Sequence, residues 1–385
     1  MRTLRVAGLF AGVGGIELGL EQAGHHAEFL CEIDPFAGAV LTQRFRDVPL
    51  HHDVTTLRSL PTVDLVTAGF PCQDISLAGT RTGLAGARSG LVGTVFELIG
   101  RRPRPPLVLL ENVQNLLRLD RGRHLDLILD EFERLRYRWA YRLVDTRGFG
   151  LPQRRQRVIL LASRCDVDPA AVLFSKAKRP GVVDRIGPME PGRQYGFYWT
   201  EGRRGVGWAV DAVPTIKAGS GFSIPSPPAI FDAESGWAST PDITDAERLQ
   251  GFRANWTRIP IDGKPVREGH RWRMVGNAVS VPVSRWIGRE LREHPQFDRS
   301  LLTDSWDPSA VRPPAACSRG RRRYAVRTTP FVERSIHRPI GKFLKAETSS
   351  LSTRALLGYV SRAREGSKRF PPGFIEALEL QAFAG

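Results

Sequence analysis

The sequence has few cysteines and no long apolar run, and both absences narrow the kind of protein it encodes. Its 4 cysteines lie far apart among 385 residues, without the paired short spacings of a zinc site or a disulfide scaffold. No apolar stretch approaches the roughly 18 residues that cross a bilayer, and the first residues lack a signal-peptide layout. We therefore expect a cytoplasmic protein that binds no metal and no membrane.

Acidic residues are scarce relative to basic ones. The chain has 56 Lys and Arg against 40 Asp and Glu, a net charge of +16, which favours a polyanionic partner. An arginine-rich composition also arises without such a partner, so charge alone decides nothing. Much of the excess lies in 308–385, where 15 basic residues face 5 acidic ones. Within that segment, Arg319–Arg323 are expected either to bind phosphates nonspecifically or to form an unstructured, solvated run.

Short apolar runs alternate with helix-like patterns from residue 4 to about residue 162. The runs are Leu4–Phe10, Ala27–Ile33, Val63–Gly69, Leu107–Leu110 and Val158–Ala162. This order predicts an α/β fold with a mostly parallel, doubly wound sheet covered by helices. Ligands of such sheets bind at the carboxyl ends of the strands.

The composition divides the chain into four segments. Residues 1–162 form the predicted sheet domain, and 163–240 are rich in Gly, Pro, Ser and aromatic residues, as in an inserted, loop-rich module. Helical patterns return in 241–307, which is expected to pack back onto the first domain. Residues 308–385 form a basic C-terminal extension.

A glycine turn follows the first predicted strand, in Phe10-Ala11-Gly12-Val13-Gly14-Gly15. Glycines let the backbone turn tightly and approach a ligand, while the following helix offers free N–H groups. The spacing is not that of a dinucleotide fold, and a purely structural turn is the alternative. Glu32 ends the next strand, where a carboxylate can bind ribose hydroxyls, and Asp53 could accept a bond from an adenine amino group.

Reactive side chains follow two other predicted strands. Pro71-Cys72-Gln73 places a thiol at the carboxyl edge, where it can reach a substrate, although most lone cysteines are small buried apolar groups. The strand Leu107–Leu110 ends in Glu111 and Asn112 at the same edge. A strand end with a solvated acid is the alternative for this pair.

A further motif, Gln153-Arg154-Arg155-Gln156-Arg157, precedes the strand at 158–162. In an extended segment Gln153, Arg155 and Arg157 point to one face, which places two guanidinium groups together. They can bind phosphate, a base oxygen or a carboxylate. A solvated basic edge that discourages strand pairing is the alternative.

Taken in order, these segments resemble the DNA (cytosine-5) methyltransferase family over roughly residues 4–290. The glycine turn is similar to that family's cofactor loop, Pro71-Cys72-Gln73 to its nucleophile motif and Glu111-Asn112-Val113 to its acid motif. The segments similar to its Gln-x-Arg-x-Arg strand and its late motifs are 153–157, 246–252 and 276–279. The resemblance implies a sheet of the S-adenosylmethionine-dependent methyltransferase type, with 163–240 as an inserted target-recognition domain.

The resemblance also implies a reaction. The enzyme would transfer a methyl group from S-adenosylmethionine to C5 of a cytosine flipped out of duplex DNA, through a covalent bond between Cys72 and C6. Glu111 would donate a proton or hydrogen bond at N3, and Asn112 would orient the site. Arg157 would contact the O2 side of the base, and Arg155 would steady the acid.

By the same resemblance, Phe10 stacks on the adenine of the cofactor, Glu32 binds its ribose, Asp53 binds its amino group, and Pro71 and Asn277 line the pocket. No metal is required, because the sulfonium is already an activated methyl donor. A restriction endonuclease or another defence protein is the expected companion.

Three other functions stay open at this point. RNA could replace DNA as the substrate, because some relatives of this family modify transfer RNA. The fold could serve as a DNA-binding scaffold without catalysis, although Cys72, Glu111, Arg155 and Arg157 are all present. A nicotinamide oxidoreductase is disfavoured by the glycine spacing.

Overall fold

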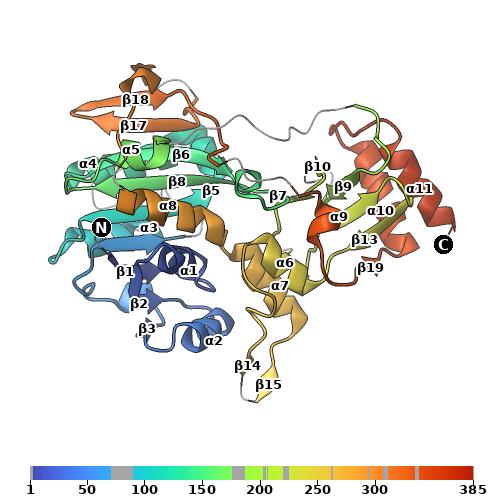
Figure 1. The fold of residues 1–385 in the computed structure, drawn as a ribbon, viewed down its shortest axis with the longest axis horizontal. Helices are drawn as coiled ribbons and strands as arrows, with labels where there is room; N and C mark the ends of the chain where they lie inside the picture. Colours follow the sequence, from blue (N-terminus) through green and yellow to red (C-terminus); the bar gives the residue numbers. More distant parts are fainter. Residues whose placement is uncertain are drawn as a thin grey trace. The chain divides into compact units, whose positions relative to one another are not determined.

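The chain forms two compact units (Figure 1). A computed structural model describes residues 3–70, 90–175, 187–202, 205, 207–219, 225–261, 263–293, 295–306, 311–333 and 338–384. The first unit comprises Met1–Asp145, Gln156–Arg179 and Val279–Glu333, and the second comprises Thr146–Arg155, Pro180–Ala278 and Arg334–Gly385. This division cuts across the four consecutive segments expected from composition, because the last segment contributes to both units.

The first unit is built around a ten-stranded sheet in the order β16-β18-β17-β6-β8-β5-β4-β1-β2-β3. Its strands are β1 Arg5–Leu9, β2 His26–Cys31, β3 Leu50–His51, β4 Leu65–Ala68, β5 Leu107–Val113, β6 Arg138–Asp145, β8 Gln156–Ser163, β16 Leu302–Ser305, β17 Ala315–Arg319 and β18 Arg322–Val326. β1 to β5 are parallel, and the chain order reverses at β1, which lies between β2 and β4. This block confirms the expected doubly wound α/β sheet. β6, β8 and β16 to β18 extend it in antiparallel fashion.

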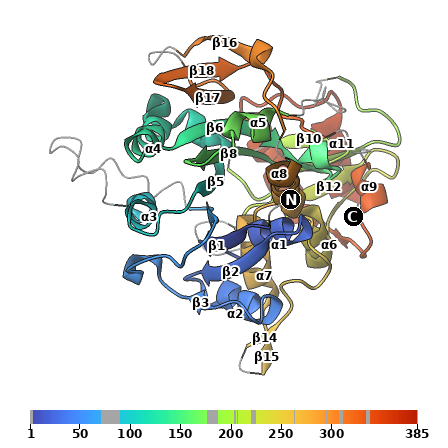
Figure 2. The same ribbon diagram turned by 60° about the vertical axis from the view of Figure 1, so that its left-hand side comes forward.

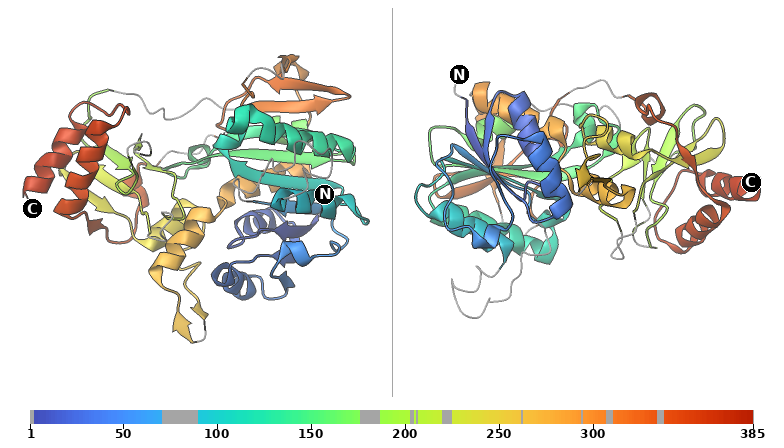
Figure 3. Two further views of the ribbon diagram at one scale, coloured as in Figure 1. Left: turned by 180° about the vertical axis from the view of Figure 1, so that it is seen from behind. Right: turned by 90° about the horizontal axis from the view of Figure 1, so that it is seen from below.

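Helices cover both faces of this sheet. They are α1 Gly15–Gln22, α2 Pro35–Arg44, α3 Leu91–Gly100, α4 Arg123–Arg134, α5 Pro169–Phe174 and α8 Val281–Glu293. α1, α5 and α8 lie on one face, and α3 and α4 lie on the other (Figure 3). α4 buries Leu125, Ile128, Leu129 and Phe132, the i, i+3, i+4, i+7 stripe of an amphipathic helix. No helix in the described part of the chain is long and apolar enough to span a bilayer.

Two glycines let α8 pack closely against α1. A Cβ atom at Gly19 would lie 2.5 Å from the carbonyl oxygen of Val281, and one at Gly288 would lie 2.6 Å from the Cβ of Ala23. His25 Nε2 is also 2.9 Å from the carbonyl oxygen of Gly288. α8 therefore packs onto the first unit, whereas residues 241–278, which were also expected to return to it, belong to the second unit.

The second unit contains a five-stranded antiparallel sheet in the order β10-β9-β12-β13-β19. Its strands are β9 Gln194–Phe197, β10 Trp208–Val210, β12 Ala229–Asp232, β13 Trp237–Thr240 and β19 Ser349–Ser350, with β7 Gln153–Arg154 paired to β11 Val213–Pro214 and a hairpin of β14 Pro260–Ile261 and β15 Lys264–Pro265. Its helices are α6 Ile243–Leu249, α7 Glu268–Asn277, α9 Ile340–Phe343, α10 Thr353–Glu365 and α11 Phe374–Ala384. Strands this short show little alternation of apolar and polar residues in the sequence. The composition therefore predicted a loop-rich module here.

The C-terminal helices supply much of the core of the second unit. Tyr359 of α10 and Phe374 of α11 are buried against the sheet, with ring centroids 4.7 Å and 5.6 Å from that of Phe197. Ala238 in β13 accepts and donates hydrogen bonds with the buried side chain of Gln381. Figure 1 shows this helix pair beside the sheet, in red. The C-terminal extension is therefore an integral part of this fold.

Arg319–Arg323 form the turn of the β17–β18 hairpin in the first unit. Arg323 lies 2.9 Å from Glu133 and 5.8 Å from the centre of the Trp139 ring, and Arg319 lies 2.9 Å from Asp168. The expectation of an unstructured run is therefore wrong, because carboxylates far away in the sequence hold the hairpin.

Candidate active site

The carboxyl ends of four strands meet at one edge of the first sheet. Leu9 of β1 is in register with Cys31 of β2 and Ala68 of β4, and Ala68 is in register with Leu110 of β5. Phe10 and Glu32 directly follow β1 and β2, and Glu111 follows Leu110 within β5, so the three lie at the same level of the sheet. Figure 2 shows β1 and β2 next to each other with β5 beyond them, and β4 lies between β1 and β5 in the strand order. Phe10, Glu32 and Glu111 thus share one edge of the sheet.

An ion pair joins β5 and β8 at this edge. Arg157 Nε lies 2.9 Å from Glu111 Oε1, and the two side chains are 14% and 11% exposed. Little water screens a pair at this depth. The sequence assigned the contact with the acid to Arg155, whereas the structure assigns it to Arg157.

Asn112 anchors the segment that leads to the nucleophile motif. Its Nδ2 donates a hydrogen bond of 3.1 Å to the carbonyl oxygen of Phe70, which is buried at the end of β4. Pro71 and Cys72 lie outside the described residues. Asn112 therefore fixes the point at which the chain leaves the sheet for Cys72, beside Glu111.

Two of the other cysteines are poor candidates for a nucleophile. Burial raises the pKa of Cys31 to about 12 and that of Cys317 to about 11, so both thiols stay protonated near neutral pH. Cys165 is half-buried, with its Sγ 3.5 Å from Ser163 Oγ. Neither buried thiol can supply the thiolate that the chemistry needs.

The glycine loop after β1 is tied to Glu32 at the end of β2. Glu32 accepts hydrogen bonds from the backbone N–H groups of Gly12 (2.7 Å) and Asp34 (2.8 Å), while burial raises its pKa. Gly12 has a φ of +55°, and an added Cβ would meet no atom within 4 Å. At Gly14, by contrast, a Cβ would lie 2.3 Å from the Phe45 ring. The loop is packed on one side and open at Gly12.

The groups around this opening fit the adenosine part of S-adenosylmethionine. Phe10 is half-buried with a φ of +54°, and Ile33, directly after Glu32, is 71% exposed. Asp53 is half-buried, and hydrogen bonds from Thr55 lower the pKa of its carboxyl. An aromatic ring, an exposed apolar side chain and two carboxylates suit an adenine and its ribose hydroxyls. The sequence analysis missed Ile33, although an apolar residue directly after the strand-ending carboxylate was a usable signal.

Arg155 belongs to the second unit and donates hydrogen bonds to backbone carbonyl groups. It is 2% exposed, and its guanidinium donates to the carbonyl oxygens of Ile216 (3.0 Å), Gly276 (3.3 Å) and Ala278 (2.7 Å). A buried cation bound to three carbonyl groups holds those segments together. The geometry therefore gives Arg155 a positioning role within the second unit.

Gln153 and Gln250 tie the other late motifs to the same segment. Gln153 donates to the carbonyl oxygen of Leu249 (2.8 Å) and accepts from the N–H of Ile216 (3.0 Å). Gln250 donates to the carbonyl oxygen of Val275 (2.9 Å). Asn277, predicted to line the cofactor pocket, is exposed at the end of α7. These motifs, far apart in sequence, form one hydrogen-bonded cluster.

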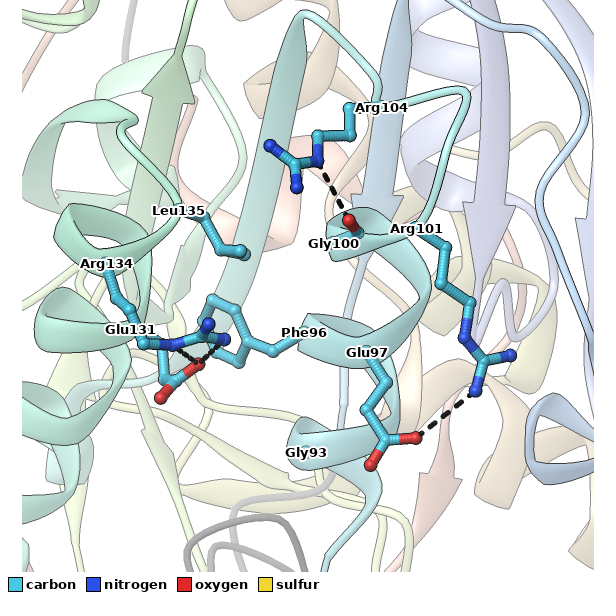
Figure 4. A pocket seen from close by; sticks show the side chains of 9 residues that line it. All are labelled: Gly93, Phe96, Glu97, Gly100, Arg101, Arg104, Glu131, Arg134 and Leu135. Atoms are coloured by element: carbon cyan, nitrogen blue, oxygen red, sulfur yellow. Dashed lines mark hydrogen bonds and ion pairs between the residues drawn. The ribbon is translucent and has the colours of Figure 1, made fainter. Parts of the chain in front are cut away.

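A hollow of about 430 Å³ lies between α3 and α4 of the first unit (Figure 4). Two of its arginines form ion pairs with glutamates close by in the sequence. Arg101 pairs with Glu97 (3.6 Å), and Arg134 pairs with Glu131 (2.6 Å). It contains none of the predicted site residues, so the candidate site is the strand edge rather than this hollow.

Comparisons with known proteins identify the family of this chain. A model of the family described as C-5 cytosine-specific DNA methylase matches residues 4–184. Type II methyltransferase M2.BsuMI of Bacillus subtilis (strain 168) is 47% identical over 98% of this chain and 97% of its own length. Type II methyltransferase M.BsuFI of Bacillus subtilis is 30% identical over 74% of this chain and 71% of its own length. The crystal structure of S. pombe Dnmt2 methyltransferase covers 76% of this chain and 99% of its own, with a TM-score of 0.53 and 18% identity, which shows the fold alone.

The doubly wound sheet of the first unit has the fold of a methyltransferase, as the likeness to Dnmt2 shows. The extent of the match with M2.BsuMI is more specific, and it confirms the resemblance found in the sequence. The chain belongs to the C-5 cytosine-specific DNA methylase family, and it is therefore a DNA (cytosine-5) methyltransferase.

Proposed function

We propose that this enzyme methylates cytosine within one short recognition sequence of duplex DNA and thereby protects that DNA from a companion restriction endonuclease. The relatives named as Type II methyltransferases support this role. The observation that carries the chemistry is the Glu111–Arg157 ion pair, next to the segment that leads to Cys72.

Cys72 supplies the nucleophile in this proposal. Its thiolate adds to C6 of the cytosine, and the electron pair of the C5–C6 double bond becomes available at C5 as an enamine. C5 then attacks the methyl group, whose bond to the sulfonium sulfur breaks and leaves a neutral thioether. Loss of the C5 proton to a base, for which ordered water is a candidate, restores the double bond and expels the thiolate.

Glu111, Arg157 and Asn112 support that addition. Negative charge gathers on the N3 side of the ring as Cys72 adds, and Glu111 meets it with a proton or hydrogen bond. Arg157 holds the Glu111 carboxyl in place and adds a positive charge that favours the thiolate. Asn112 holds the base of the Cys72 segment through Phe70.

The cofactor, when bound, supplies an electrophilic methyl group on a sulfonium. Phe10 and Ile33 offer the apolar surfaces for its adenine, Glu32 accepts from its ribose hydroxyls, and Asp53 accepts from its amino group. Pro71 and Asn277 keep their predicted place in the pocket as part of this proposal.

The target cytosine is flipped out of the helix, because a stacked ring offers no face for attack at C6. The unstacking costs a few kcal/mol, which contacts with the grooves and phosphates must offset. The second unit, with its antiparallel sheet, is the part of the chain to which we assign recognition of the sequence.

The test maps 5-methylcytosine at base resolution in unmethylated plasmid incubated with S-adenosylmethionine and enzyme. One recurring short sequence is the expected result. Cys72→Ala should abolish methylation and retain cofactor binding, while Cys165→Ala, a matched change of another lone cysteine, should remain active. Full activity of Cys72→Ala contradicts the mechanism. A blank plasmid map with methylated transfer RNA contradicts the substrate.

A further inference from the structure

A basic loop follows the acid motif at the same edge of the first unit. β5 ends at Val113, two short 3-10 turns cover Gln114–Leu117 and Leu119–Gly122, and α4 begins at Arg123. The second of these turns and the residues on either side of it form the segment 118–123, which we call the basic loop. The first turn contacts both β8 and α4, so the loop is continuous with the candidate active site.

The charges of the basic loop face solvent. Arg118, Arg121 and Arg123 are all exposed. The loop's one acid, Asp120, lies 3.7 Å from Arg123, with 67% of the Arg123 side chain and 37% of the Asp120 side chain exposed. A pair of this kind contributes little and is easily exchanged for another anion. The loop therefore presents a net positive surface.

The backbone of the loop is held in an unusual shape. Asp120 and Arg121 have φ values of 46° and 55°, and Gly122 has a φ of +85°. Left-handed conformations of residues other than glycine cost about 1 kcal/mol each and persist only where the surroundings impose them. The buried side chains of Leu116 and Leu117 fix the chain just before the loop.

A buried arginine from the C-terminal segment supports the loop from beneath. A Cβ at Gly122 would lie 2.4 Å from Arg312 Cγ, so only glycine lets the Arg312 side chain pass there. Arg312 is 3% exposed, donates to Asp126 of α4 (3.0 Å) and lies 5.2 Å from the centre of the Trp306 ring. The loop is thus set before any ligand arrives, which lowers the entropic cost of binding.

We propose that the basic loop binds phosphates of the DNA backbone beside the target cytosine. Guanidinium groups form charge-assisted, bidentate contacts with phosphate, and the loop leaves the sheet at the edge that carries Glu111 and Arg157. This inference rests on the proposed function, because it assigns part of the surface that receives the DNA. It differs from the assignment of phosphate binding to Arg319–Arg323, of which Arg319 and Arg323 are paired with carboxylates.

The test compares two double variants of equal charge. Arg118→Gln with Arg121→Gln changes the loop, and Arg321→Gln with Arg322→Gln changes two exposed arginines at the tip of the β17–β18 hairpin. The affinity of full-length protein for duplex DNA is measured at a series of salt concentrations. Each lost phosphate contact should lower the slope of log K against log salt by about 0.9.

We expect the loop variant to lose one to two such contacts and the hairpin variant to keep the wild-type slope. The loop variant should also show a several-fold higher KM for DNA, with kcat and the affinity for S-adenosylmethionine unchanged. An unchanged slope in the loop variant, or equal losses in both variants, overturns the inference. A wild-type protein that binds duplex DNA in the salt series but does not methylate it overturns the proposed function, whereas the comparison of the two variants still decides the role of the loop.

Discussion

Arg155 and Arg157 lie two residues apart in one motif, yet they belong to different units and have different partners. Arg157, in the first unit, contacts the Glu111 carboxyl at the edge of the sheet. Arg155, in the second unit, is nearly inaccessible and donates to backbone carbonyl groups. The comparison shows that the motif supplies both chemistry and architecture. Replacing Arg157 and replacing Arg155 should therefore have different effects on the enzyme.

The largest effect is expected at Arg157. Replacing Arg157 with Ala removes the group that holds the Glu111 carboxyl and should lower the single-turnover rate of methyl transfer on the order of 10³-fold, about 4 kcal/mol. The thermal midpoint and the affinity for S-adenosylmethionine should change little. Arg157→Lys should recover part of the rate, because it retains the charge without the planar contact. A loss of less than tenfold in Arg157→Ala would contradict this role.

The opposite pattern is expected at Arg155. Arg155→Met keeps the volume but leaves the carbonyl groups of Ile216, Gly276 and Ala278 without their donor. The free energy of unfolding should fall by about 3 kcal/mol, as measured by denaturant titration. Arg157→Met is the matched control, and it should lose activity with little loss of stability. Equal stability losses in the two variants would remove the distinction between the units.

The sequence could predict the edge of the first sheet, because the signal there is local. An apolar run followed by Glu32 or by Glu111 places a carboxylate at the carboxyl end of a strand, and neighbouring strands bring these ends together. It could not predict the partners of the two arginines. The face argument assumed one extended strand, whereas β7 ends at Arg154 and β8 begins at Gln156, so the chain breaks at Arg155.

The basic C-terminal segment was harder to interpret for a related reason. Composition counts its arginines but does not show which carboxylates they meet. Arg323 contacts Glu133, and Arg312 contacts Asp126. The partners in these two pairs are 190 and 186 residues apart in the sequence. Long-range pairing of this kind leaves no periodicity that a single sequence reveals. Part of the charge that suggested a nucleic-acid tail, at Arg312, Arg319 and Arg323, therefore holds the hairpin in place.

The smallest expected effect concerns two buried carboxyl groups, one in each unit. Glu17 of α1, in the first unit, is fully buried and accepts a hydrogen bond from Thr67 Oγ1 (2.8 Å), and burial raises its pKa from 4.5 to about 7. Glu21 and Glu32 raise the pKa of Glu17 further. Glu247, in the second unit, is equally buried but accepts from Arg271 Nη2 (3.0 Å) and from the N–H of Thr257 (2.8 Å).

The folded protein therefore binds a proton at Glu17 more tightly than the unfolded chain does. Its contribution to stability is complete below about pH 4.5 and is lost as the pH rises through about 7, by roughly 3 kcal/mol at most. Glu17→Gln stays neutral, so its advantage over wild type in the free energy of unfolding should be small at pH 5 and should grow to about 2 kcal/mol at pH 8. Glu247→Gln should be less stable than wild type at both pH values, because it breaks the pair with Arg271. If the difference between Glu17→Gln and wild type does not change between pH 5 and pH 8, Glu17 is not the group that titrates. Glu17 and Glu247 would then differ only in how their side chains pack, and not in how their protonation affects stability.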